Sequence, residues 1–276
     1  MSIRRLLEQW DLRPSKGLGQ NFIANPAVLE KIVAAAELSA SDVVMEIGAG
    51  LGTMTRLLAR DAGCVAAVEL DRRLIPVLQS ELAGLDNVTL TQGDILELDP
   101  VALVGGPDIE YKVVANLPYY ITSAVLRHLL EGAFKPRRMV LTVQREVAER
   151  IVAKPGRMSL LAVSVQFYGR PKLLFRIKPG SFYPVPRVQS AVLRVDVPPM
   201  PIVSVEDEGV FFRVVRAGFS QRRKQLRNTL AAGLRQAPSE VAAKMGQVDV
   251  DPRRRAETLS LDEWARITRV LSDLKS

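Results

Sequence analysis

A glycine-rich segment directly after an apolar run is the feature of this sequence that most constrains its fold. Residues 42–47 read DVVMEI, and three glycines follow at alternate positions, Gly48, Gly50 and Gly52. A helical pattern then covers residues 53–60. A buried strand, a glycine turn and a helix make the first half of a βαβ unit, in which helices connect parallel strands. The segment therefore predicts an α/β fold built on a parallel sheet.

The rest of the first 200 residues continues this alternation of strands and helices. Strands are expected at residues 64–69, 88–92, 111–115 and 139–143, and helices at 72–82 and from Thr122 onward. Strands that alternate with helices need crossover connections, which gives a doubly wound, Rossmann-like sheet with helices on both faces. Two later apolar runs, 173–177 and 191–195, are joined by a proline-rich connection and predict a closing, hairpin-like pair.

A change of composition near residue 200 predicts a second domain. Residues 197–203 read VPPMPIV, which is typical of a linker. Only helical patterns follow, at residues 209–219, 224–234, 239–245 and 261–271. We therefore expect a first domain over residues 1–200 and a small, all-helical C-terminal domain over residues 201–276.

Three carboxylates near strand ends indicate which nucleotide the glycine loop binds. The third glycine of the dinucleotide fingerprint would fall at position 53, where the chain has Thr53. Glu46 precedes the first glycine by two residues, Glu69 ends the second expected strand and Asp94 follows the third. In a doubly wound sheet these strand ends meet at one crevice. A pyrophosphate would face several carboxylates there without a compensating basic group.

S-adenosylmethionine suits such an acidic crevice, because it carries a sulfonium and an ammonium group and no phosphate. Glu69 is expected to bind the ribose hydroxyls, and Asp94 to accept hydrogens from the adenine amino group. The alternatives are a nucleotide-binding loop of another kind, or tight turns without a ligand.

The stretch VVANLPYYITSAV, residues 113–125, indicates what the donor acts on. Pro118 has no N–H and disfavours the helical region for Leu117, so the peptide at the strand end stays open. The Asn116 side-chain oxygen and the Leu117 carbonyl can accept the two hydrogens of an exocyclic base amine. Tyr119 can stack on the base, which must leave its own stack to reach the pocket, and stacking needs no hydroxyl. The alternative is a strand-terminating turn with core aromatics.

The charge distribution indicates a polyphosphate partner. The chain carries a formal net charge of +8. Seven Lys and Arg residues and no acid lie between Phe211 and Arg235, and a second cluster is Arg253–Arg255. Such patches suit nucleic acid, although a solvated helix face would look the same. A single histidine excludes a multi-histidine metal cluster, and neither a secretory signal nor a membrane-spanning run is recognisable, so a cytoplasmic location is expected.

Five motifs in order along nearly the whole chain resemble one known family. They are KGLGQNFIAN, EIGAGLGTMT, NLPYYITS, GSFYPVPRVQSAV and FSQRRKQLRNTL, and they are similar to those of the KsgA family of small-subunit ribosomal RNA adenine dimethyltransferases. The resemblance implies dimethylation of two adjacent adenosines in the 3′-terminal hairpin of 16S rRNA, late in 30S assembly. It implies donor binding by Asn21, Ile23, Gly48, Glu69, Asp94 and Asn116.

The resemblance also implies roles in catalysis and RNA binding. The target adenine would lie between Tyr119 and Phe182, with its amine held at Asn116 and Leu117. Phosphates of 16S rRNA within an immature 30S subunit would meet the basic stretch, with Arg222, Arg223, Lys224 and Arg227 as candidates. A monomer is expected, and the reaction is a direct in-line displacement at the donor methyl, without a metal or a covalent enzyme intermediate.

Two other functions remain open on the sequence. One is a related enzyme of the macrolide-resistance type, which methylates 23S rRNA of the large subunit. The other is a ribosome-assembly factor whose binding to the subunit matters more than its methylation. The SFYPVPRV and QRRKQLRN segments favour the small-subunit enzyme by resemblance.

Overall fold

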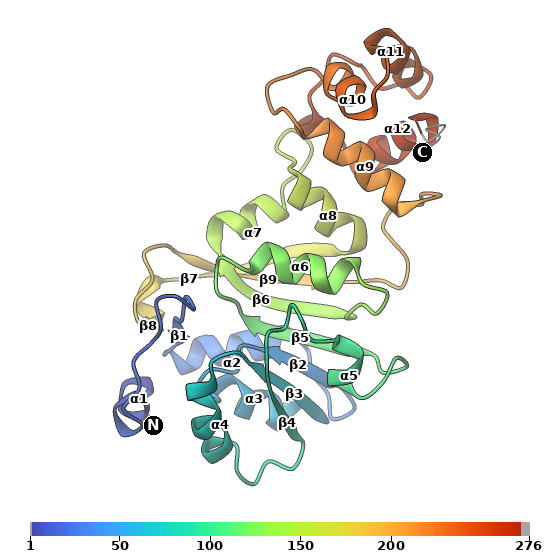
Figure 1. Ribbon diagram of the computed structural model, residues 1–276. Helices are drawn as coiled ribbons and strands as arrows, with labels where there is room; N and C mark the ends of the chain where they lie inside the picture. Colours follow the sequence, from blue (N-terminus) through green and yellow to red (C-terminus); the bar gives the residue numbers. More distant parts are fainter. Residues whose placement is uncertain (1, 272–276) are drawn as a thin grey trace. The chain divides into compact units, whose positions relative to one another are not determined.

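The computed structural model describes residues 2–271, which form two compact units (Figure 1). The first unit is the chain up to Ala148 together with Pro171–Val197. The second is Glu149–Arg170 together with the described residues from Pro198 onward. Residues 149–170, which the sequence analysis placed in the first domain, group instead with the C-terminal helices.

The first unit contains most of the strands. Its elements are α1 (Ile3–Gln9), β1 (Phe22–Ile23), α2 (Pro26–Ala35), β2 (Val43–Ile47), α3 (Thr53–Asp61), β3 (Cys64–Glu69), α4 (Ile75–Glu81), β4 (Val88–Gln92), α5 (Pro100–Val104), β5 (Tyr111–Asn116), α6 (Thr122–Glu131), β6 (Arg138–Gln144), β7 (Arg170–Ile177), β8 (Phe182–Tyr183) and β9 (Ser190–Asp196). Helix α7 (Arg145–Ile151) begins in this unit and ends in the second, and the first residue of β7, Arg170, also belongs to the second. The sequence analysis did not anticipate α1, β1, α2, α5, β8 or α7.

The main sheet has seven strands in the order β4-β3-β2-β5-β6-β9-β7. Strand β2 pairs in parallel with β3 and β5, and the pairs β3–β4 and β5–β6 are also parallel. Strand β9 is antiparallel to β6. The chain moves outward from β2 to β4 and then resumes on the other side with β5, so a switch point lies between β2 and β5. Ligands bind at such a point in doubly wound folds, and the predicted α/β class is confirmed.

Buried apolar side chains explain why these segments become central strands. Strand β2 reads VVMEI, and its last four residues are buried, as are the first five of β5. Near-continuous apolar runs are typical of parallel strands that are covered on both faces. One buried cluster joins Val44, Val114 and Val140 on the sheet to residues of helices α1 to α4. Neighbouring residues such as Val113 face the opposite side, because side chains alternate along a strand.

The second unit is helical and packs around aromatic rings. Its further helices are α8 (Leu160–Tyr168), α9 (Glu208–Gly218), α10 (Leu226–Leu234), α11 (Pro238–Gly246) and α12 (Leu261–Leu271). The ring of Phe167 stacks on that of Phe211 with centroids 4.6 Å apart, and the Ile202 N–H donates to the Phe167 carbonyl over 2.8 Å. These contacts explain why residues 149–170 group with the C-terminal helices rather than with the segment before them.

Candidate functional site

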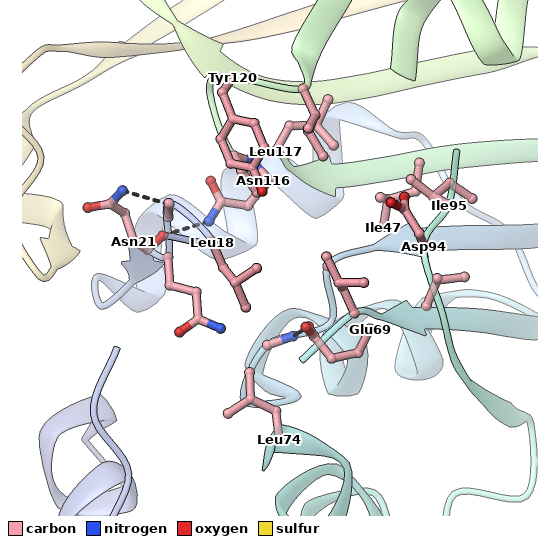
Figure 2. A pocket seen from close by; sticks show the side chains of 18 of the residues that line it. Leu18, Asn21, Ile47, Glu69, Leu74, Asp94, Ile95, Asn116, Leu117 and Tyr120 are labelled. Atoms are coloured by element: carbon pink, nitrogen blue, oxygen red, sulfur yellow. Dashed lines mark hydrogen bonds between the residues drawn. The ribbon is translucent and has the colours of Figure 1, made fainter. Parts of the chain in front are cut away.

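A pocket in the first unit lies at the switch point of the sheet (Figure 2). Residues at or just beyond the ends of four neighbouring parallel strands line it: Gly48 after β2, Glu69 on β3, Asp94 after β4 and Asn116 on β5. The empty space in the pocket is about 810 Å³, a figure that includes solvent at its mouth. Mostly apolar side chains with a few polar groups at strand ends are typical of small-molecule binding sites.

The glycine loop forms one wall of the pocket in a conformation that side chains rarely adopt. Gly48 has a φ of +78° and Gly50 a φ of +59°. A Cβ at Gly50 would lie 3.1 Å from the Phe22 ring. The Gly50 N–H donates to Glu69 Oε2 over 2.8 Å. The spacing that identified the loop in the sequence thus reflects a real backbone requirement at these positions.

The carboxylates beside the loop do not all face the pocket. Glu69 and Asp94 line it, whereas Glu46 is fully buried, outside the pocket lining, and neither of its carboxylate oxygens has a hydrogen-bond partner among the described residues. Burial raises the pKa of Glu46 to about 8. Burial also raises the pKa of Glu69, opposed by hydrogen bonds from the Asp71 and Gly50 backbone. Two of the three expected acids therefore face the ligand space, and the expectation that Glu46 does so was wrong.

Asn116 is oriented by a segment from the other end of the sequence. Its side-chain Nδ2 donates to the Asn21 carbonyl over 2.8 Å (Figure 2). Because that nitrogen is engaged, the amide oxygen is the end of the side chain that remains for a ligand. The Leu117 N–H donates to the Thr142 carbonyl over 3.2 Å, which holds the open peptide before Pro118 against β6. Asn116, Leu117 and Tyr119 all line the pocket, so the structure brings these three predicted site residues together.

The two tyrosines that follow differ in their surroundings. The hydroxyl groups of Tyr119 and Ser190 are hydrogen-bonded over 2.7 Å. Burial raises the pKa of Tyr119, and the bond to Ser190 opposes that rise. Tyr120 also lines the pocket, but 62% of its surface is exposed. The hydroxyl of Tyr119, dispensable for stacking alone, therefore has a specific partner here.

The segment before β1 closes the pocket along one side. Asn21, a predicted donor-binding residue, lines the pocket, and its Nδ2 donates to the Gly19 carbonyl over 3.0 Å. Gln20 bridges two other segments: its Oε1 accepts from the Ser15 N–H over 2.7 Å, and its Nε2 donates to Asp71 Oδ2 over 2.9 Å. The segment therefore connects to Asp71, two residues after β3, and to Asn116 at the end of β5.

Two predicted site residues lie elsewhere. Ile23 and Phe182 are paired on the short strands β1 and β8, are 4% and 3% exposed, and belong to the hydrophobic core cluster. Neither lines the pocket. The side chain of Phe182 in this conformation is not available to cover the second face of a base, contrary to expectation.

Several pocket residues were not singled out from the sequence. Among them are Leu18, Gln20, Leu70, Leu74, Ile95 and Tyr120. Leu70 and Ile95 directly follow Glu69 and Asp94, so an apolar residue after each strand-end acid is a signal that could have identified them. Such side chains suit the flat faces of an adenine ring.

The predicted RNA-binding cations lie in the second unit. Arg222, Arg223 and Lys224 occupy the loop between α9 and α10 and are exposed, although a helix was expected from residue 224, and Arg227 lies on α10. Within residues 2–271 none of the four has an ion-pair partner. This supports an exposed cationic loop rather than a paired helix face.

The second basic cluster is different. Arg253 pairs with Asp251 at 3.0 Å, and Arg254 pairs with Glu263. Two of its three arginines are therefore compensated by acids, which weakens the case for this cluster as a phosphate-binding surface.

In the described part of the chain, no group of His, Cys, Asp and Glu residues could hold a metal ion, and none of the helices there has the length and apolar character of a membrane span.

The pocket lining fits the methyl donor better than a dinucleotide. Among the described residues that line it there are two carboxylates and no Lys or Arg. A pyrophosphate would be repelled there, whereas a sulfonium and an ammonium would be attracted. Together with the doubly wound sheet and the glycine loop, this lining defines an S-adenosylmethionine-dependent methyltransferase.

The chain belongs to the ribosomal RNA adenine dimethylase family, whose model matches residues 13–273. It is 47% identical over 264 residues to a protein of Dehalococcoides mccartyi named ribosomal RNA small subunit methyltransferase A, covering 96% of this chain and 90% of that protein. A protein of the same name from Moorella thermoacetica is 45% identical, with 96% and 95% covered. The chain is thus an S-adenosylmethionine-dependent rRNA adenine dimethyltransferase.

Two solved structures resemble the fold over most of the chain. A dimethyladenosine transferase from Plasmodium falciparum superimposes with a TM-score of 0.76 at 23% identity, covering 89% of this chain and 95% of that one. The 23S rRNA methyltransferase ErmE gives a TM-score of 0.73 at 26% identity, covering 91% and 99%. The first comparison supports the fold alone.

Proposed function

We propose that this enzyme dimethylates the exocyclic amines of two adjacent adenosines in the 3′-terminal hairpin of 16S rRNA. The observation that carries the proposal is that the Asn116–Tyr119 segment shares one pocket with the acids Glu69 and Asp94. The names of the relatives at 45–47% identity support the small subunit as the substrate. Action on an immature 30S particle late in assembly, as a cytoplasmic monomer without a metal, is part of the same proposal.

The donor is held at the ends of strands β2, β3 and β4. Glu69 binds the ribose hydroxyls through the lone pairs that its two backbone bonds leave, since a carboxylate can accept about four hydrogen bonds. Asp94 accepts from the adenine amino group, with Ile95 against the ring. Gly48 permits close approach of the backbone, and Asn21 bounds the methionine end. When bound, the donor supplies an electrophilic methyl carbon on a positively charged sulfur.

The target amine is held at the end of β5. Its lone pair is delocalised into the purine ring, so it is a weak nucleophile. Asn116 Oδ1 and the Leu117 carbonyl accept its two hydrogens, which favours a pyramidal nitrogen with its lone pair directed away from both acceptors. These two groups act by positioning, since neither needs to change its protonation state. The Asn116 side chain stays in place through its bond to the Asn21 carbonyl.

The base itself is stacked on Tyr119 after leaving the RNA stack. In the conformation described, Phe182 is packed in the core, so the proposal assigns stacking to Tyr119 alone. The exposed loop that contains Arg222, Arg223 and Lys224, with Arg227 on α10, binds rRNA phosphates. Because such contacts release counterions, binding weakens steeply with salt.

Large-subunit rRNA is the second candidate substrate, because the fold also matches the 23S enzyme ErmE.

The test of the proposed function is methylation of purified 30S and 50S subunits from cells that lack this chain, followed by mass spectrometry of the rRNA. We expect two dimethyladenosines in the small-subunit rRNA and none in the 50S subunit. Product in the 50S subunit alone would reject the proposal. Restored subunit maturation by an inactive, RNA-binding variant would instead favour a role as an assembly factor.

A further inference from the structure

Ser190 is a buried polar residue to which the proposed mechanism gives no role. It lies at the start of β9, opposite Gln144 of β6, and its side chain is 0% exposed. Its hydroxyl is hydrogen-bonded to the hydroxyl of Tyr119 over 2.7 Å, across 71 residues of sequence. An unpaired buried hydroxyl is costly, so the pair is a specific and mutually satisfying contact.

This contact acts at the far end of the Tyr119 side chain. A tyrosine ring swings about χ1, and rotation there moves the hydroxyl further than any other heavy atom of the side chain. A bond at that atom therefore restricts the ring more than a contact near Cβ would. The backbone of the same segment is held separately, by the bond from Leu117 N–H to the Thr142 carbonyl. Neighbouring strands thus restrain both the peptide and the ring.

Tyr120 shows what an unrestrained ring looks like in the same segment. It is 62% exposed, and no side-chain hydrogen bond to its hydroxyl is present among residues 2–271. Only one of the two consecutive tyrosines is therefore fixed at its hydroxyl, and it is the one placed to stack on the target base.

We propose that Ser190 is a positioning residue for methyl transfer, which sets the ring of Tyr119 for stacking on the target adenine. The inference rests on the proposed role of Tyr119. Stacking itself needs only the ring of Tyr119. The inference nevertheless predicts that loss of the Tyr119 hydroxyl lowers the rate of methyl transfer, because the hydrogen bond to Ser190 is lost. A purely structural role for the pair would instead change stability and leave the rate of the folded enzyme unchanged.

The test compares Ser190→Ala, Tyr119→Phe and the double variant in single-turnover methylation of unmethylated 30S subunits at saturating donor. Each single change should lower the saturating rate roughly fivefold, the size expected for one hydrogen bond, and the double variant should be no slower than either. Donor affinity, measured by calorimetry, should be unchanged. Tyr111→Phe is the matched control, because it removes a buried tyrosine hydroxyl from the opposite end of β5, bonded at 3.4 Å to the Phe134 carbonyl.

A conservative variant tests the assignment further. Ser190→Thr keeps a hydroxyl at the position and should retain most of the rate that Ser190→Ala loses. Should Ser190→Ala fail to fold, Tyr119→Phe alone still tests the bond, because it leaves Ser190 in place. Parental rates for Tyr119→Phe, or multiplicative losses in the double variant, would overturn the inference. Tyr119→Ala distinguishes failure of this inference from failure of the proposed function. A parental rate in Tyr119→Ala would mean that Tyr119 does not act in the site at all.

Discussion

Asn116 shows how the function of a single side chain depends on a distant backbone group. Its Nδ2 donates to the Asn21 carbonyl, 95 residues earlier in the chain, and this leaves the amide oxygen for the target amine that we propose it binds. The residue type was readable from the sequence, because an amide directly before Leu-Pro-Tyr at a strand end is conspicuous. The sequence did not predict the direction in which the amide points.

Asn116→Ala should abolish methyl transfer while RNA binding persists, because the acceptor of the amine is lost and the phosphate contacts lie on other residues. Donor affinity should fall only partly, since Glu69 and Asp94 remain. Single-turnover methylation of 30S subunits at saturating donor measures the chemical step without interference from binding. A near-parental rate would mean that the segment is only a strand-terminating turn.

Glu46 makes the stability of the protein depend on pH in a predictable direction. Its pKa is raised by burial to about 8 in the folded state, from an ordinary value of 4.5. Between these values the folded state holds a proton that the unfolded state has lost. The stability that this proton contributes is complete below about pH 4.5 and is lost as the pH rises through about 8.

Glu46→Gln removes that titration, because an amide does not ionise. Relative to the parent, the variant should gain free energy of unfolding between pH 6 and pH 8.5, on the order of a few kcal/mol over that range. Urea unfolding at several pH values measures the difference. An identical pH dependence in parent and variant would show that Glu46 does not carry a raised pKa.

The elements of the sheet were predicted well because each is encoded locally. The expected strands at residues 64–69 and 88–92 have the observed bounds, and the closing pair corresponds to β7 and β9, neighbours at one end of the sheet. The two-residue strands β1 and β8 were missed. They are too short to show a pattern, and they exist only because residues 22–23 pair with residues 182–183.

The segment over residues 15–21 provides a prediction at the scale of an element. Gln20 joins it to Asp71, so Gln20→Ala should loosen this side of the pocket and lower donor affinity roughly fivefold. Gln20→Glu should lower it more, because a carboxylate would face Asp71. Calorimetric titration with the donor measures both. Equal affinity in all three proteins would show that the segment is held by Asn116 and Asn21 alone.

At the scale of the whole molecule, the exposed cationic loop lies in the second unit and the pocket in the first. The loop with Arg222, Arg223 and Lys224 lacks ion-pair partners in the described part of the chain, whereas Arg253 and Arg254 have them. Sequence composition identified both clusters equally, and only the positions of Asp251 and Glu263 distinguish them.

Replacing Arg222, Arg223 and Lys224 by Ala should weaken binding to 30S subunits and reduce the slope of log affinity against log salt by roughly 2–3, if all three contact phosphates. Filter binding at several salt concentrations measures the slope. The matched control replaces three paired, exposed arginines, Arg127, Arg137 and Arg253, and so removes the same charge. Equal slopes for both triple variants would show that the loop is a solvated surface that does not contact rRNA phosphates.

The sequence by itself determined the features that short segments encode: the strand and helix pattern, the glycine loop, the strand-end acids and the open peptide before Pro118. Tertiary structure decided which of these residues line the pocket. Glu46 is buried, whereas Glu69 and Asp94 line the pocket. Ile23 and Phe182 pack in the core, and Tyr119 is hydrogen-bonded to Ser190. These outcomes depend on contacts between segments far apart in the chain. Local periodicity does not predict which distant residue a side chain will contact.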